Sequence, residues 1–310
     1  MALQALLPQH IDSTMLSCFR SCPRKFYLEF CYGLRPAGLS VDLHAGACFA
    51  TAIETVYREV WLHKSPLDTA MLKAHAAMLV AWGDFEIPEW KSTAKTFDRM
   101  WELVEFYFTK YSPRTDHIQP YFAADGNPTF EYSFAIPLML EDGFPLHPSG
   151  EPFLYSGRID LLGQMGNRTV IRDEKTMGRS FSSDWSQLWN LRGQFMGYVW
   201  AIQQLGIDCD TVVIRGMSVL KTLLDTQEAT KTFSRFMIER WYDQLRRDLW
   251  RIHRSWDENH FDFNFGETCT SYGKPCIFHN SCESFTPEAW FADFEVRRWS
   301  PLTRSKTGDI

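Results

Sequence analysis

The sequence predicts a mixed α/β fold, and three observations lead to this expectation. Apolar residues recur at helical spacing through the first 112 positions, strand-like and helix-like segments alternate from about residue 128, and an irregular cysteine-bearing segment follows residue 262. The chain has 310 residues, of which 45% are hydrophobic and 23% charged, which excludes a disordered chain and a small disulfide scaffold. We expect one integrated domain made of an N-terminal helical lobe (1–127), a core (128–262) and a Cys-rich C-terminal segment (263–310).

The N-terminal part is expected to be helical. A first helical segment over 12–31 begins at Asp12 or Ser13, which can cap it, and is interrupted at Cys22-Pro23 because proline lacks an amide donor. Apolar side chains at i, i+3 and i+4 predict three further helices, over 44–63, 66–84 and 91–112.

The central part predicts a sheet flanked by helices. A strand is expected over 129–136, and 153–165 and 169–175 are expected to form an antiparallel pair joined at Gly166-Asn167. Three more elements follow along the chain: a helix over 184–205, a buried strand over 211–219 and a long helix over about 229–258.

Charge and hydropathy restrict the partners. The net charge is −6, which excludes a general basic coat for nucleic acid but not a local basic groove. No apolar run approaches the roughly 20 residues that span a bilayer, and the first residues lack the pattern of a signal peptide. We therefore expect no membrane contact and a cytoplasmic location, where eight cysteines are more typical of free thiols or metal ligands than of disulfides.

Two acidic segments carry the strongest chemical signal. They are Gly157-Arg158-Ile159-Asp160 and Asp173-Glu174-Lys175-Thr176. Strand side chains alternate between faces, so Asp173 and Lys175 are expected on one face and Glu174 on the other, and strand pairing would bring Asp160 towards Asp173. Two carboxylates form a hard-oxygen site for Mg²⁺ or Mn²⁺, and a nearby lysine can orient a water or stabilise phosphoryl charge. The alternative for an isolated Asp-x-Lys is a solvated ion pair of little energy.

A third motif follows about twenty residues later. Gln194 and Tyr198 stand at i and i+4 on one predicted helix face, where they could touch a phosphate, a base or Lys175. The alternative is the polar edge of an otherwise apolar helix.

Together these motifs resemble the PD-(D/E)XK nuclease superfamily, and most closely its RecB-like exonuclease branch, with the AddB-type and CRISPR-adaptation nucleases and their phage relatives. The resemblance implies a metal-dependent DNA exonuclease that acts on linear, single- or double-stranded DNA, with a partner protein of recombination or CRISPR adaptation. It implies the following site: Asp160, Asp173 and the Glu174 carbonyl as ligands of Mg²⁺ or Mn²⁺, Lys175 as a catalytic residue, and Gln194 and Tyr198 as the accessory motif.

One departure from the family pattern concerns an early helix. Family members often carry Gly-x-x-x-His, with the histidine as a metal ligand. Here the position four residues after Gly46, where the histidine would stand, is Ala50. Glu54, one turn later, and His44 are the candidate replacements, and an oxygen ligand suits Mg²⁺ at least as well as imidazole. If neither reaches the metal, the protein is expected to be a weak or inactive DNA-binding or recombination scaffold.

The cysteines suggest a second metal centre. Cys22 and the late triad Cys269, Cys276 and Cys282 give four thiolates, the number that a 4Fe–4S cluster needs, and RecB-like nucleases with a cluster have a similar arrangement. Two alternatives are a zinc site of the late triad with His279 and unliganded thiols. Such a centre would staple the chain ends and place three basic residues near the DNA, namely Arg20, Arg24 and Lys25.

Overall fold

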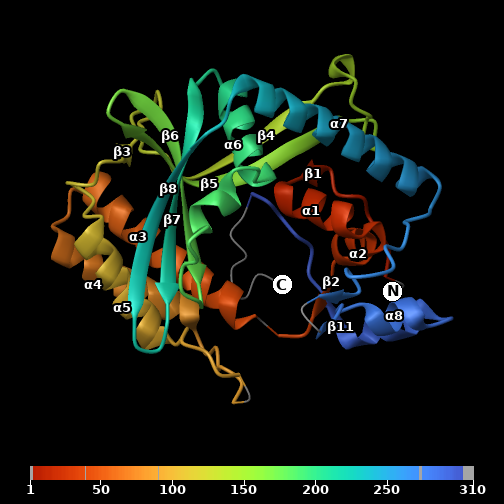
Figure 1. Cartoon of the computed structure of the whole chain (residues 1–310), viewed down its shortest axis with the longest axis horizontal. Coiled ribbons are helices and arrows are strands. Elements are labelled where there is room, and N and C mark those ends of the chain that lie inside the picture. The colour runs from red at the N-terminus through yellow and green to blue at the C-terminus, as the bar shows by residue number, and fades with distance from the viewer. Residues whose placement is uncertain (1–2, 39, 90, 272–273, 303–310) are drawn as a thin grey trace.

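The computed structural model describes residues 3–38, 40–89, 91–271 and 274–302. A seven-stranded sheet lies between two groups of helices (Figure 1). Helices α3, α4 and α5 pack their apolar residues against one face, and α1, α6 and α7 pack against the other. The expected mixed sheet flanked by helices is therefore confirmed.

The bounds of the elements are as follows. The helices are α1 (Ser13–Ser21), α2 (Pro23–Phe26), α3 (Val41–Trp61), α4 (Leu67–Trp82), α5 (Phe97–Lys110), α6 (Gly193–Gln204), α7 (Arg235–Asp257) and α8 (His279–Glu283). The sheet contains β1 (His10–Ile11), β3 (Gln119–Pro120), β4 (Phe130–Leu138), β5 (Phe153–Met165), β6 (Arg168–Met177), β7 (Cys209–Val219) and β8 (Leu224–Thr232). The short strands β2 (Leu34–Pro36) and β11 (Phe294–Val296) pair with each other, as do β9 (Thr270–Ser271) and β10 (Lys274–Pro275).

The pairing of β5 with β6 is partial, and this shapes the centre of the sheet. The antiparallel register runs only from Leu161 opposite Arg172 to Met165 opposite Arg168. Before Leu161, β5 pairs with β4, whereas β6 continues to Met177 in parallel pairing with β7. The two strands therefore separate at Leu161 and Arg172, and we call this separation the fork.

Capping residues explain how the first helices begin and end. Asp12 accepts a hydrogen bond from the Met15 amide at the start of α1, as the sequence predicts. The interruption at Cys22-Pro23 is also confirmed, because α2 starts at Pro23 and the Cys22 sulfur accepts from the Lys25 amide.

Three predicted boundaries are wrong. The helix expected over 184–205 is a 3₁₀ turn (Trp185–Trp189) followed by α6, and the helix expected from 91 begins at Phe97, where Thr96 caps it. The helix expected over 229–258 begins at Arg235, because residues 224–232 form β8 instead. This edge strand is mostly polar and exposed, so it lacks the apolar alternation of a buried strand.

Gly197 allows α6 to approach the sheet closely. A Cβ atom at this position would lie 1.9 Å from the Tyr155 hydroxyl and 2.7 Å from Cζ2 of Trp241, both in the core. We expect Gly197→Ala to lower the free energy of unfolding by about 3 kcal/mol, the upper end of overpacking effects. Gly178→Ala is the matched control, since nothing lies within 4 Å of its Cβ position. Urea denaturation of both variants measures the difference, and equal midpoints would contradict this packing argument.

Candidate active site

Asp160 lies at the fork between β5 and β6. Its Oδ2 accepts a hydrogen bond of 2.9 Å from the backbone amide of Glu174 on β6. Because the strands have separated here, the Glu174 amide donates to the Asp160 side chain and not to a backbone carbonyl of β5. Burial, and next the charge of Asp173, raise the pKa of Asp160, so the two carboxylates lie near each other at the fork.

Asp173 and Lys175 share one face of β6. Lys175 Nζ lies 2.7 Å from Asp173 Oδ2, and Asp173 is buried. Glu174 points to the opposite face, where its Oε1 accepts from the Tyr107 hydroxyl at 2.8 Å and pairs with Arg172 Nε at 2.6 Å. The alternation expected from a strand is therefore observed, and the Asp-x-Lys pair is not a solvated edge pair.

Burial sets the protonation of this group. Burial raises the pKa of both Asp160 and Asp173, and the two neighbouring aspartates raise the pKa of Lys175 although burial opposes this. Lys175 therefore remains a cation at neutral pH. Once both are ionised, two buried carboxylates that share a single ammonium group carry excess negative charge, which a hard divalent cation would neutralise. The donor set fits Mg²⁺ or Mn²⁺ on these chemical grounds.

The raised pKa of Asp160 predicts a pH-dependent stability. In the metal-free protein Asp160 binds its proton more tightly in the folded than in the unfolded state, so stability falls as pH rises above the unfolded pKa of about 4. We expect Asp160→Asn, which keeps an acceptor for the Glu174 amide, to be more stable than wild type at pH 7 and to lose this advantage at pH 4. Urea midpoints in EDTA test this, with exposed Asp225→Asn as control; a less stable variant at pH 7 would contradict the electrostatic argument.

The accessory pair on α6 binds the β5 backbone. Gln194 Nε2 donates to the Tyr198 hydroxyl at 3.0 Å, and this hydroxyl donates to the Arg158 carbonyl at 2.8 Å. The Tyr198 ring also lies 3.1 Å from the Cβ position of Gly157, so only glycine fits there without a shift. The pair thus fixes β5 two residues before Asp160, a contact that sequence reasoning did not foresee.

Two arginines that received no predicted role contribute to the site. Arg192, directly before α6, is near enough to act on Asp173 and Lys175, where its charge opposes the net rise of both pKa values. Arg158 pairs with Glu131 at 2.6 Å, and Glu131 has a left-handed backbone with φ of 49°. The signal for Arg192 was its place beside Gln194 in the sequence, whereas nothing in the sequence pointed to Glu131.

Helix α3 contacts the end of β6, but its candidate ligands have other partners. The Cβ position of Gly46 lies 3.6 Å from Thr176 Oγ1, and Arg172 donates to Tyr57 of α3, so this helix packs on the Glu174 face of β6, opposite Asp173 and Lys175. Glu54 forms an ion pair with Arg58 at 2.7 Å. His44 is buried among aromatic rings between α3 and α4, with the Phe85 ring centroid at 4.0 Å, so it has the environment of a core histidine.

The face of β6 opposite Lys175 contains a buried ion network. Arg215 forms two hydrogen bonds of 2.6 Å with Asp116, and its Nη1 donates to the Tyr107 hydroxyl at 3.0 Å. Tyr107 in turn donates to Glu174. This network supports the strand that carries Asp173 and Lys175.

The four candidate cluster cysteines gather where the two chain ends meet. The Arg24 amide donates to the Asp262 carbonyl at 3.0 Å, and the Cys276 amide donates to the Cys269 carbonyl at 2.7 Å. Burial raises the pKa of Cys282 to about 11, and Cys276, Cys22 and Cys269 are near enough to add to this rise. His279 instead lies 3.4 Å from Glu283.

These thiols do not close around a common point. Within residues 3–302, leaving out 39, 90, 272 and 273, no three His, Cys, Asp or Glu side chains are arranged to hold a metal ion. The predicted iron–sulfur cluster is therefore not supported by the geometry, and the carboxylate site offers two side-chain ligands rather than three. The sequence also suggests four core cysteines: Cys31, Cys48 and Cys209 are buried, whereas Cys18 is half-buried with its thiol 3.8 Å from Glu29 Oε2.

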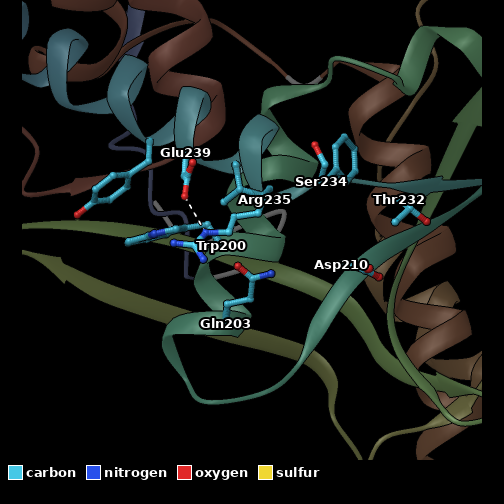
Figure 2. A pocket seen from close by; sticks show the side chains of 10 residues that line it. Trp200, Gln203, Asp210, Thr232, Ser234, Arg235 and Glu239 are labelled. Carbon is cyan, nitrogen blue, oxygen red and sulfur yellow. Dashed lines mark hydrogen bonds and ion pairs between the residues drawn. The ribbon is translucent and has the colours of Figure 1, made fainter.

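A pocket of about 570 Å³ lies elsewhere on the molecule, between α6, α7 and the start of β7 (Figure 2). Trp200, Gln203 and Asp210 line it, and Arg235 pairs with Glu239 at 2.7 Å along the wall that α7 forms. Because Asp210 is six residues from Gly216, the β7 partner of Lys175, the pocket is roughly 20 Å from the level of Lys175 along the strand. It contains none of the predicted site residues.

Comparison with known proteins decides the family. The model of the PD-(D/E)XK nuclease superfamily matches residues 13–283. The chain belongs to the PD-(D/E)XK nuclease superfamily. No curated protein matches it. Among solved structures, the fold of this nuclease is similar to that of a "Putative exonuclease" from Eubacterium rectale, with a TM-score of 0.51 and 13% identity over 82% of this chain and 84% of that chain.

A second solved structure, SSO0001, is more distant: it has a TM-score of 0.32 and 11% identity over 86% of this chain and 84% of that chain. Neither likeness assigns a substrate to this nuclease. In the described part of the chain, no helix is both long and apolar enough to cross a membrane.

Proposed function

We propose that the protein is a metal-dependent DNA exonuclease whose site consists of Asp160, Asp173 and Lys175 at the fork. The meeting of two buried carboxylates with one lysine carries the proposal. The superfamily supports nuclease activity, and the similarity to a protein named as an exonuclease favours cleavage from DNA ends.

In this proposal Asp160, Asp173 and the Glu174 carbonyl hold Mg²⁺ or Mn²⁺, and Glu54 is a further oxygen ligand in place of the family histidine. The bound ion supplies Lewis-acid charge and lowers the pKa of a water molecule. Lys175 stays protonated beside Asp173 and orients the attacking water or stabilises charge on the phosphoryl oxygens. Gln194 and Tyr198 hold β5 so that Asp160 stays opposite Asp173.

The basic residues near the fork contact the DNA backbone. Arg192 acts electrostatically on Asp173, and Arg20 Nη1 lies 3.8 Å from the Cβ position of Gly193, next to Arg192. Arg24 and Lys25 extend the same basic path, which gives binding through phosphates with little sequence preference.

The four cysteines, by the same proposal, form a 4Fe–4S centre that staples the chain ends. The proximity of Cys22, Cys269 and Cys276 to Cys282 is its support, and cluster binding requires these four thiols to move closer together. Protein purified without oxygen should be brown and contain about four iron atoms per chain. A colourless protein with one zinc would favour Cys269, Cys276, Cys282 and His279 instead, and metal-free protein would indicate plain thiols.

The exonuclease proposal is tested with end-labelled linear DNA and covalently closed circular DNA. We expect wild-type protein to degrade the linear DNA in Mn²⁺ or Mg²⁺, to leave the circle intact, and to do nothing in EDTA. Cleavage of the circle would indicate an endonuclease.

A second candidate function is a DNA-binding or recombination scaffold without catalysis. Ala50 at the family histidine position and the Glu54–Arg58 ion pair favour it. Binding of linear DNA without cleavage in either metal ion would support the scaffold and reject the exonuclease.

A further inference from the structure

Two exposed phenylalanines form a stacked pair next to the basic path. The rings of Phe263 and Phe265 have centroids 5.2 Å apart and planes only 2° apart. Phe265 is 80% exposed and Phe263 is 39% exposed. Parallel aromatic rings that are exposed together offer a flat apolar surface, and exposed apolar patches of this kind mark interaction sites.

The stack continues into the protein through Arg24. The Arg24 guanidinium lies 5.5 Å from the centroid of Phe263 on one side and 5.6 Å from that of Tyr27 on the other. Tyr27 stacks on the buried Phe261 with a centroid distance of 4.5 Å. A cation between aromatic rings stiffens such a column, so the inner end of the stack is anchored in the core and its outer end is free.

Backbone contacts fix the segment that carries these rings. The Arg24 amide donates to the Asp262 carbonyl at 3.0 Å, and Asp262 lies between the buried Phe261 and the exposed Phe263 in the sequence. Asn264 donates to the Ser21 carbonyl and to Thr268 Oγ1. The side chains of the alternate residues 261, 263 and 265 are therefore held in line rather than left on a free loop.

The stack lies beside cationic groups that lead to the fork. Arg20 on α1 and Lys25 on α2, with side chains 34% and 35% exposed, lie on either side of Arg24 in the sequence. Arg20 pairs with the buried Asp248 at 2.6 Å and reaches the start of α6 next to Arg192, while Lys25 lies 3.9 Å from Glu29. The four cations Arg20, Arg24, Lys25 and Arg192 outnumber these two carboxylates, and this local excess of positive charge favours an anionic partner in a chain of net charge −6.

We propose that Phe263 and Phe265 form a base-stacking platform for single-stranded DNA, with Arg24 as its support. The inference rests on the proposed function and deepens it, because it assigns an unpaired strand to the path between the platform and the fork. Every base has a flat π-face, so the platform binds bases without reading their sequence, while Arg20 and Lys25 bind the phosphates.

The test compares oligo-dT with an oligonucleotide of equal length and charge whose sugars carry no bases. Fluorescence anisotropy in EDTA measures the dissociation constant of each, so cleavage plays no part. We expect wild type to bind oligo-dT about tenfold more tightly than the abasic strand. Phe265→Ala should bring this ratio close to one, and Phe265→Trp should preserve it.

Phe236→Ala is the matched control. Phe236 is 63% exposed and lies under Arg240 at 5.3 Å, but it belongs to α7, outside the stacked column. Its loss should leave the ratio unchanged. A wild-type ratio near one, or an unchanged ratio in Phe265→Ala, would overturn the platform even if the protein degrades DNA. A high ratio in a protein that never cleaves DNA would retain the platform and reject the exonuclease.

Discussion

Lys175→Ala should reduce DNA cleavage by roughly a hundredfold to a thousandfold, the usual cost of removing one group that stabilises charge in the transition state. Its ammonium lies 2.7 Å from Asp173 and is the positive charge that the site supplies on this face of β6. The loss should be in kcat rather than KM, because Lys175 acts on the reacting phosphate and not on the remainder of the DNA. Single-turnover cleavage of labelled linear DNA measures it.

The control for this prediction is Lys231→Ala on β8, a partly exposed lysine outside the fork, which should cleave at the wild-type rate. In the wild type the Lys175 ammonium competes with the metal ion for the Asp173 carboxylate. The Mn²⁺ affinity of Lys175→Ala should therefore be equal to or higher than that of wild type. Wild-type cleavage by Lys175→Ala would exclude it as a catalytic residue.

Arg215→Met should destabilise the fold by about 3–5 kcal/mol, the effect of removing one partner of a buried ion pair. Arg215 is fully buried, and Asp116 would be left in the core with Arg172 Nη1 at 3.5 Å as its remaining arginine partner among the described residues. The two arginines hold the pKa of Asp116 below its usual range despite burial, so loss of Arg215 should also raise that pKa. The free energy of unfolding from urea titration at pH 7 measures the cost.

The control here is Arg235→Met, whose side chain is 93% exposed and pairs only with a solvent-exposed glutamate on α7. It should change stability by less than about 0.5 kcal/mol. If Arg215→Met were as stable as this control, the buried network would not support β6. Tyr107→Phe offers a second test of the network, because the Tyr107 hydroxyl bridges Arg215 and Glu174 and its removal should also lower the free energy of unfolding.

The parts of the site that depend on local chain geometry could be predicted from the sequence. Alternation along a strand places Asp173 and Lys175 together, and one hairpin register brings Asp160 to them. The interruption before Pro23 likewise follows from the chemistry of proline. These inferences need only the strand or helix to which a residue belongs.

The parts of the site that depend on tertiary contacts could not be predicted from the sequence. The bond from Tyr198 to the Arg158 carbonyl requires the angle at which α6 crosses β5, which no spacing encodes. The pairing of Arg215 with Asp116 joins residues 99 positions apart. Strand β8 was missed because it lies at the edge of the sheet, where polar residues are accepted on both faces of a strand. Its sequence therefore lacks the apolar alternation of a strand, and its last residues were assigned to the helix that follows.

The most direct test of the account compares wild type and Asp173→Asn in Mn²⁺-dependent degradation of linear DNA. The account predicts steady loss of the linear substrate with wild type, none in EDTA, and at least a thousandfold slower loss with Asp173→Asn, which keeps the size of the side chain but not its charge. Equal degradation by the two proteins would contradict the claim that the carboxylates at the fork hold the catalytic metal ion.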